Sequence, residues 1–124
     1  MDRDIVQRSF EFALKILTLA STLPKTIVGD IVSKQVVRVG TSIGANVEEA
    51  QAGFTKEDFI YKNNVALKEA RETHYWLRMV KAGKIAEPEH VDPLIDEAEE
   101  LKKILGAIVS KARGKSKKTG QSGK

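Results

Sequence analysis

The sequence contains no cysteine, which excludes disulfide bonds and thiolate metal sites and fits a reducing compartment. It also lacks any apolar run near the roughly 20 residues that span a bilayer. Its first residues, MDRDIVQRSF, carry charges of both signs and lead into no apolar core followed by a small-residue cleavage site, so we expect no signal peptide. These absences predict a cytoplasmic protein that does not enter a membrane.

Proline is scarce, and its three positions separate helical patterns. Pro24 follows the first pattern, while Pro88 and Pro93 lie in a later connection. Between these breaks the apolar residues recur every three or four positions, which indicates helices rather than strands. A chain of 124 residues is long enough for one domain with one core.

Four amphipathic helices follow from this periodicity. The first two cover about residues 4–23 and 27–52. The third follows an N-cap at Thr55 and ends near Ala82. The fourth begins between Pro88 and Pro93, with Asp92 as N-cap and Pro93 as first residue. In the first helix the expected buried line comprises Val6, Phe10, Ala13, Leu17 and Ala20, with Ile5, Phe12 and Ile16 beside it. In the second it comprises Val32, Val36, Val39, Ile43, Val47 and Ala50, and in the third Phe59, Ala66, Ala70, Thr73, Leu77 and Val80. In the fourth it comprises Val91, Leu94, Ala98, Leu101, Leu105, Ile108 and Ala112. This pattern predicts an all-α, up-down-up-down antiparallel four-helix bundle over residues 1–113.

The net charge of +4 is unevenly distributed. Residues 111–124 hold six basic side chains and no acidic one, namely Lys111, Arg113, Lys115, Lys117, Lys118 and Lys124. By contrast, residues 87–100 hold seven acidic side chains and no lysine or arginine. Because residues 114–124 offer no apolar side chain to bury, we expect a disordered basic C-terminal tail there.

The second helix carries two unusual flanks. Gly40 and Gly44 lie one turn apart on one side, although each glycine costs on the order of 1 kcal/mol relative to alanine in a helix interior. That cost is tolerable where the missing side chains admit another helix at close range. The alternative is that both glycines lie on a solvated face.

The opposite flank of the second helix is polar, and the third helix has a matching flank. The two flanks comprise Gln35, Arg38, Ser42, Asn46 and Glu49, and Lys62, Glu69, Glu72 and Trp76. We expect the two helices to pair, with Arg38 or Lys62 joined to an acidic residue of this set. Serine and asparagine are poor mid-helix residues, so an ordered network is favoured over a solvated face. Such networks specify register and partner choice, and we predict that these residues form an oligomer interface.

The residues Gln35, Arg38, Ser42, Ile43, Asn46, Glu49 and Phe59, with the segment ALKEARETHYWL, closely resemble the bacterial four-helix bundle proteins of which some are encoded by intervening sequences in large-subunit ribosomal RNA genes. The chain departs from that family at Ala50, where glycine is usual. The resemblance implies a homopentameric ring around a central channel. It also implies kinship with the accessory variability determinant of diversity-generating retroelements, which binds a reverse transcriptase and nucleic acid.

Little in the sequence indicates catalysis. His74 lies at the edge of the third helix's apolar line and is interpreted as an interior or boundary histidine. His90 ends the segment EPEH, which has the spacing used in di-iron bundles, but those sites need a second copy and further inward glutamates. Phosphate loops, zinc-protease motifs and nucleophile elbows do not occur. We therefore predict no catalytic residue, no metal and no cofactor.

Two functional hypotheses remain. In the first, the protein is a non-catalytic, self-associating scaffold whose six basic tail residues bind RNA or DNA and which engages a reverse transcriptase. In the second, it is a protein-interaction module without direct nucleic-acid binding, whose acidic run, residues 87–100, suits a basic partner. The tail would then serve only as a solubilising terminus.

Overall fold

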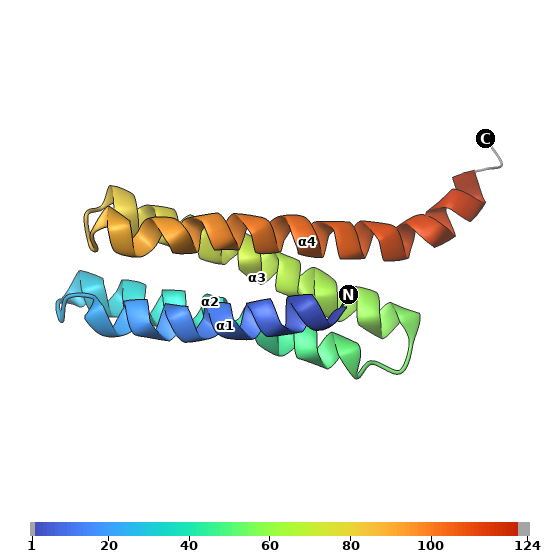
Figure 1. Cartoon of the computed structure of the whole chain (residues 1–124), viewed down its shortest axis with the longest axis horizontal. Coiled ribbons are helices and arrows are strands. Elements are labelled where there is room, and N and C mark those ends of the chain that lie inside the picture. Colours follow the sequence, from blue (N-terminus) through green and yellow to red (C-terminus); the bar gives the residue numbers. More distant parts are fainter. Residues whose placement is uncertain (1, 122–124) are drawn as a thin grey trace.

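The computed structural model describes the backbone of residues 2–121 and the side chains of residues 4–114. It contains four helices: α1 (Asp2–Thr22), α2 (Ile27–Gln51), α3 (Lys56–Ala82) and α4 (Pro88–Gln121). They run alternately up and down, joined by short loops (Figure 1). No strand occurs among the described residues. The predicted antiparallel four-helix bundle is therefore confirmed.

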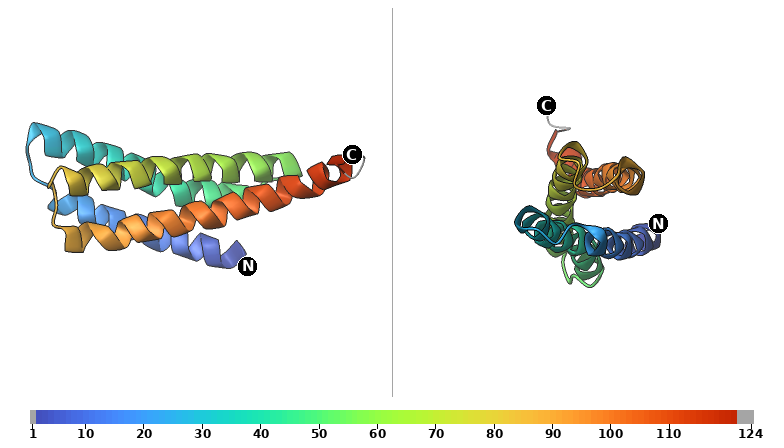
Figure 2. Two further views of the ribbon diagram at one scale, coloured as in Figure 1. Left: turned by 90° about the horizontal axis from the view of Figure 1, so that it is seen from above. Right: turned by 90° about the vertical axis from the view of Figure 1, so that its left-hand side faces the viewer.

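Each helix packs mainly on its neighbour in the chain. The end-on view places the four helices around one core, with α1 and α4 at the most open edge (Figure 2). At that edge Arg8 donates two hydrogen bonds to Glu97, from Nε at 2.9 Å and from Nη2 at 2.7 Å. None of the helices in the described part of the chain combines the length and apolar character needed to cross a bilayer.

The helix ends agree with the predicted caps in α3 but not in α4. The Thr55 hydroxyl accepts a hydrogen bond from the Asp58 amide at 3.0 Å, as predicted. The prediction that Asp92 caps α4 is wrong, because the helix begins at Pro88 and contains Pro93 in its second turn. Pro88 suits the first helical position, where no amide is needed. Pro93 removes only one main-chain hydrogen bond, which is not enough to end the helix.

The expected buried lines of α2, α3 and α4 face the core, with Phe59, Ile108 and Ala112 only partly buried. The prediction for α1 is wrong in part: Phe10 and Leu17 are exposed. The neighbouring line is buried instead and comprises Ile5, Phe12, Ile16, Leu19 and Leu23. Two apolar lines share this helix, and only one of them can face the core.

The backbone of α4 stays helical to Gln121, beyond the tail boundary that we predict at Gly114 (Figure 1). A helix already nucleated by packing extends at one hydrogen bond per residue, so an apolar face is not required at its end. Lys111 and Arg113 are exposed. The side chains of Lys115, Lys117 and Lys118, and the whole of Lys124, lie outside the described part of the structure.

Candidate functional site

The nine polar residues predicted on α2 and α3 lie along the edge where these two helices meet, and we call this set the polar seam. Two ion pairs cross it. Arg38 Nη2 lies 2.9 Å from Glu72 Oε2, and Lys62 Nζ lies 2.6 Å from Glu49 Oε1. The predicted joining of Arg38 and Lys62 to acidic partners is confirmed, within a single chain.

Arg38 is the centre of a longer network. Its Nη2 also donates to Gln35 Oε1 at 2.8 Å, and Trp76 Nε1 donates to Glu72 Oε2 at 3.4 Å. The last bond is long and correspondingly weak. Residues one turn apart on each helix are therefore linked across the α2–α3 contact, and Trp76 is tied to Arg38 through one carboxylate.

In the middle of the polar seam, the hydrogen bonds of the α2 side chains stay within α2 and do not cross to α3. Asn46 Nδ2 donates to the Ser42 carbonyl oxygen at 2.9 Å and to its hydroxyl at 3.1 Å. The two ion pairs set a register in which Ser42 is level with Glu69. Oε1 of Glu69 is buried and has no hydrogen-bond partner among the described residues. The role of the polar seam between copies of the chain stays a prediction.

The glycine flank of α2 faces α1. A Cβ at Gly40 would lie 2.8 Å and 2.9 Å from the two γ carbons of Ile16, and one at Gly44 would lie 3.2 Å from the Ser9 carbonyl oxygen. Ser9 is buried and donates its hydroxyl to the Ile5 carbonyl at 2.8 Å. The expectation that these glycines admit a helix at close range is confirmed, and that helix is α1 of the same chain.

A row of large apolar side chains on the outer side of α1 was not predicted as a surface. Phe10, Leu14 and Leu17, which we call the α1 stripe, are 54%, 50% and 46% exposed. Ile27, Val28 and Ile31 at the start of α2 are also exposed. The signal was present in the sequence as two parallel apolar lines on one helix, more than a single core-facing side requires.

His74 is partly buried, which agrees with the expected interior or boundary position. It faces α4, with Nε2 3.5 Å from Glu99 Oε1. Burial lowers the pKa of His74, and the nearby charges of Lys102 and Arg78 lower it further, against an opposing effect of Glu99. His90 is exposed. Within the described residues, no three histidine or carboxylate side chains are grouped so that they could bind a metal ion.

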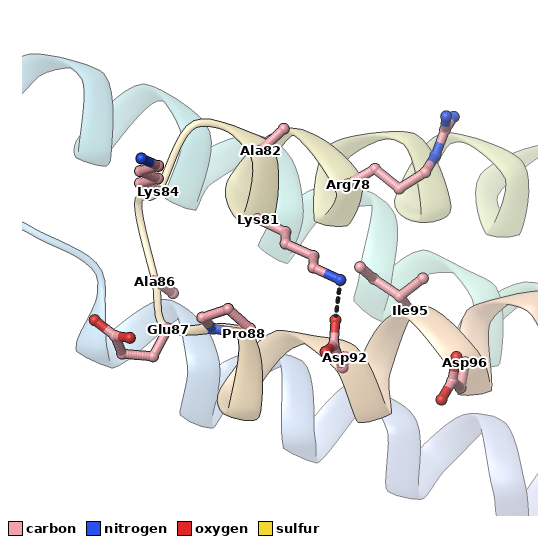
Figure 3. Close-up of a pocket in the computed structure, with 10 residues that line it drawn as sticks. All are labelled: Arg78, Lys81, Ala82, Lys84, Ala86, Glu87, Pro88, Asp92, Ile95 and Asp96. Carbon is pink, nitrogen blue, oxygen red and sulfur yellow. Dashed lines mark ion pairs between the residues drawn. The ribbon is translucent and has the colours of Figure 1, made fainter.

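A broad pocket of about 960 Å³ opens between the end of α3 and the start of α4. Lys81 and Asp92 point toward each other across it and form an ion pair at 2.8 Å (Figure 3). Arg78 and Asp96 point away from this pair (Figure 3). The other charged residues that line the pocket are Lys84 and Glu87. The lining residues therefore do not place a nucleophile beside a base.

Comparisons with known proteins agree on one family. The family model described as 23S rRNA-intervening sequence protein matches residues 1–107. A crystal structure from Bacteroides thetaiotaomicron VPI-5482, of a protein with unknown function from the S23 ribosomal protein family, superposes with a TM-score of 0.82 at 38% sequence identity. The match covers 88% of this chain and 97% of that one. Among curated proteins, none matches the sequence.

Proposed function

The chain belongs to the 23S rRNA-intervening sequence protein family, and we propose that it acts as a non-catalytic scaffold that assembles with copies of itself and binds nucleic acid. The observation that carries this proposal is the α1 stripe. Phe10, Leu14 and Leu17 follow one another along one side of the helix and remain about half exposed. A contiguous apolar row on a soluble bundle marks an interaction surface rather than scattered exposure.

A second copy is the occupant that we propose for this row. The exposed residues Ile27, Val28 and Ile31 at the start of α2 offer a different apolar surface on the same chain. Contact between two different surfaces repeats from copy to copy and closes into a ring when the rotation allows it. The family resemblance suggests five copies. The exposed side chains of the polar seam, among them Arg38, would then extend this interface.

The nucleic-acid part of the proposal rests on the basic end of α4. Lys111 and Arg113 are exposed there, and four further lysines follow in the sequence. A ring would bring several such ends together and raise their effective concentration for one strand. A reverse transcriptase is the protein partner that the resemblance to retroelement accessory proteins suggests.

Light scattering on the purified protein tests the assembly. We expect the wild type to have a mass several times 13.7 kDa, and Leu14→Asp to have the mass of one chain, because a charge in the α1 stripe cannot be buried without a partner. Phe54→Asp, at a 98% exposed loop position, is the matched control and should assemble normally. A wild-type mass of 13.7 kDa would refute self-association.

Deletion of residues 114–124 tests nucleic-acid binding. We expect weaker retention on RNA and a shallower salt dependence, by roughly 0.7 log units per log of salt for each lost phosphate contact on a single strand. Unchanged retention on RNA would show that residues 114–124 do not contribute to nucleic-acid binding. If the full chain binds neither RNA nor DNA at low salt, the protein-interaction module is the better description, with the acidic run, residues 87–100, facing a basic partner.

A further inference from the structure

The solvent side of α3 carries a row of six polar and aromatic residues, which we call the α3 row. It comprises Tyr61, Asn64, Lys68, Arg71, Tyr75 and Arg78. Their spacing alternates between three and four, so all six lie along one side of the helix. All six are exposed, and the two tyrosines are 64% and 48% exposed.

The α3 row is positively charged and not neutralised. Among the described side chains, no ion pair involves Lys68, Arg71 or Arg78, whereas Lys62 and Lys81 elsewhere on α3 are both paired. The row itself contains no acidic residue. Arg78 also points away from the carboxylates of the neighbouring pocket (Figure 3). A polyanion therefore meets three unpaired cations along this side of the helix.

One of the two aromatic rings contacts two neighbouring side chains of α3. Tyr75 makes an edge-to-face contact with Trp76, with ring centroids 5.6 Å apart and planes at 79°. Trp76 is in turn tied to Glu72 of the polar seam. The Arg78 guanidinium lies 5.9 Å from the centre of the Tyr75 ring. Tyr75 is thus held in place by its neighbours while about half of its surface stays accessible.

We propose that the α3 row binds single-stranded nucleic acid. Tyr61 and Tyr75 provide stacking surfaces for unpaired bases, Lys68 and Arg71 contact the phosphates between them, and Arg78 contacts the strand beyond Tyr75. The tyrosines are 14 residues apart, about 21 Å along a helix, which suits a short extended strand. Stacking on aromatic rings beside a basic track accepts any base sequence, because every base has a π face. Paired bases in a duplex do not offer that face.

The inference rests on the proposed nucleic-acid function but names a surface separate from the tail. Fluorescence anisotropy with a labelled, unstructured RNA oligonucleotide, and with DNA of the same sequence, tests it on the full chain. We expect the double variant Tyr61→Ala/Tyr75→Ala to raise the Kd about ten-fold or more. Lys68→Ala/Arg71→Ala should lower the salt slope by about 1.4, from two lost phosphate contacts.

Two exposed residues away from the α3 row are matched controls. Phe54→Ala removes an aromatic ring and Lys25→Ala removes a positive charge, and both should bind like the wild type. All variants change exposed side chains, and circular dichroism and light scattering confirm fold and assembly. A loss confined to the RNA or to the DNA probe identifies the ligand, and either result supports the inference.

The outcomes separate this inference from the proposed function. If Tyr61→Ala/Tyr75→Ala binds as the wild type does while deletion of residues 114–124 abolishes binding, the α3 row is not the site and the proposed function stands. If the wild type binds neither probe at low salt, the nucleic-acid function itself fails. If polyglutamate displaces the probes and binds the tyrosine variant as tightly as the wild type, the row recognises acidic protein, and the inference is overturned.

Discussion

At Gly40 and Gly44 the lack of a side chain determines how closely α1 approaches α2. The neighbours of a Cβ at these positions are the branched part of Ile16 and the backbone of Ser9, and neither can move aside by a simple rotation. Gly106 in α4 differs, since nothing lies within 4 Å of the position that its Cβ would occupy. The same residue type therefore has opposite roles in two helices of one chain.

We predict opposite effects of alanine at these positions. Gly106→Ala should raise the free energy of unfolding by about 1 kcal/mol through helix propensity. Gly40→Ala should lower it by about 1–2 kcal/mol, because overpacking costs more than the propensity gain. Urea denaturation measures both. Equal stabilisation by the two substitutions would show that α1 is not in tight contact at Gly40.

His74 predicts a pH dependence. Burial, Lys102 and Arg78 lower its pKa in the folded state, so the unfolded chain binds the proton more readily than the folded chain does. Stability is therefore fully present above the unfolded pKa of about 6.5 and is lost as the pH falls below it. Urea denaturation at pH 7 and 5.5 should show this loss in the wild type and a smaller one in His74→Gln. An equal loss in both would exclude His74 as the cause.

Among the elements, α1 is the helix with apolar residues on two sides. Its inner line, with Phe12 and Ile16, is buried in the core, while the α1 stripe lies outside. It packs mainly on α2, and its contact with α4 is less extensive, as the open edge in Figure 2 indicates. The two hydrogen bonds from Arg8 to Glu97 join the first and last helices at this edge.

A double-mutant cycle on Arg8 and Glu97 should give a coupling energy of about 1 kcal/mol, since the pair is bidentate and about two-thirds buried. The pair between Lys103 and Glu100, which is 3.8 Å long and mostly exposed, is the control, with an expected coupling near zero. Urea denaturation of the single and double alanine variants provides the measurement. Indistinguishable couplings would mean that Arg8 does not join α1 to α4.

At the scale of the whole molecule, the surfaces divide by chemistry. The α1 stripe is apolar, two ion pairs cross the polar seam, and the α3 row and the end of α4 are basic. Because the described residues of α1 and α3 do not pack directly against each other, substitutions in the α1 stripe and in the α3 row test the proposed self-association and the proposed nucleic-acid binding separately.

The proposed self-association predicts that stability depends on protein concentration. If only the folded chain associates, the Tm of the wild type should rise with concentration, while that of Leu14→Asp should stay constant. Differential scanning calorimetry over a hundred-fold range of concentration measures this. A constant Tm for the wild type would contradict coupled folding and association.

Local periodicity and capping were enough to predict much of this protein. The positions of α1, α2 and α3, the buried lines of α2, α3 and α4, the Thr55 cap and the ion pairs of Arg38 and Lys62 follow from the spacing of apolar and charged residues. Each of these features depends on neighbours three or four positions away or on one matched flank. Such relations can be recognised from the order of residues in the sequence.

Other features depended on how the helices pack. The sequence shows two apolar lines on α1, but which line is buried depends on how α1 lies against Gly40 and Gly44 of α2. The exposure of the α3 row likewise follows from the placement of neighbouring helices. Whether a side chain is buried depends on which other helix packs against it. That packing is determined only when the four helices assemble into the tertiary structure.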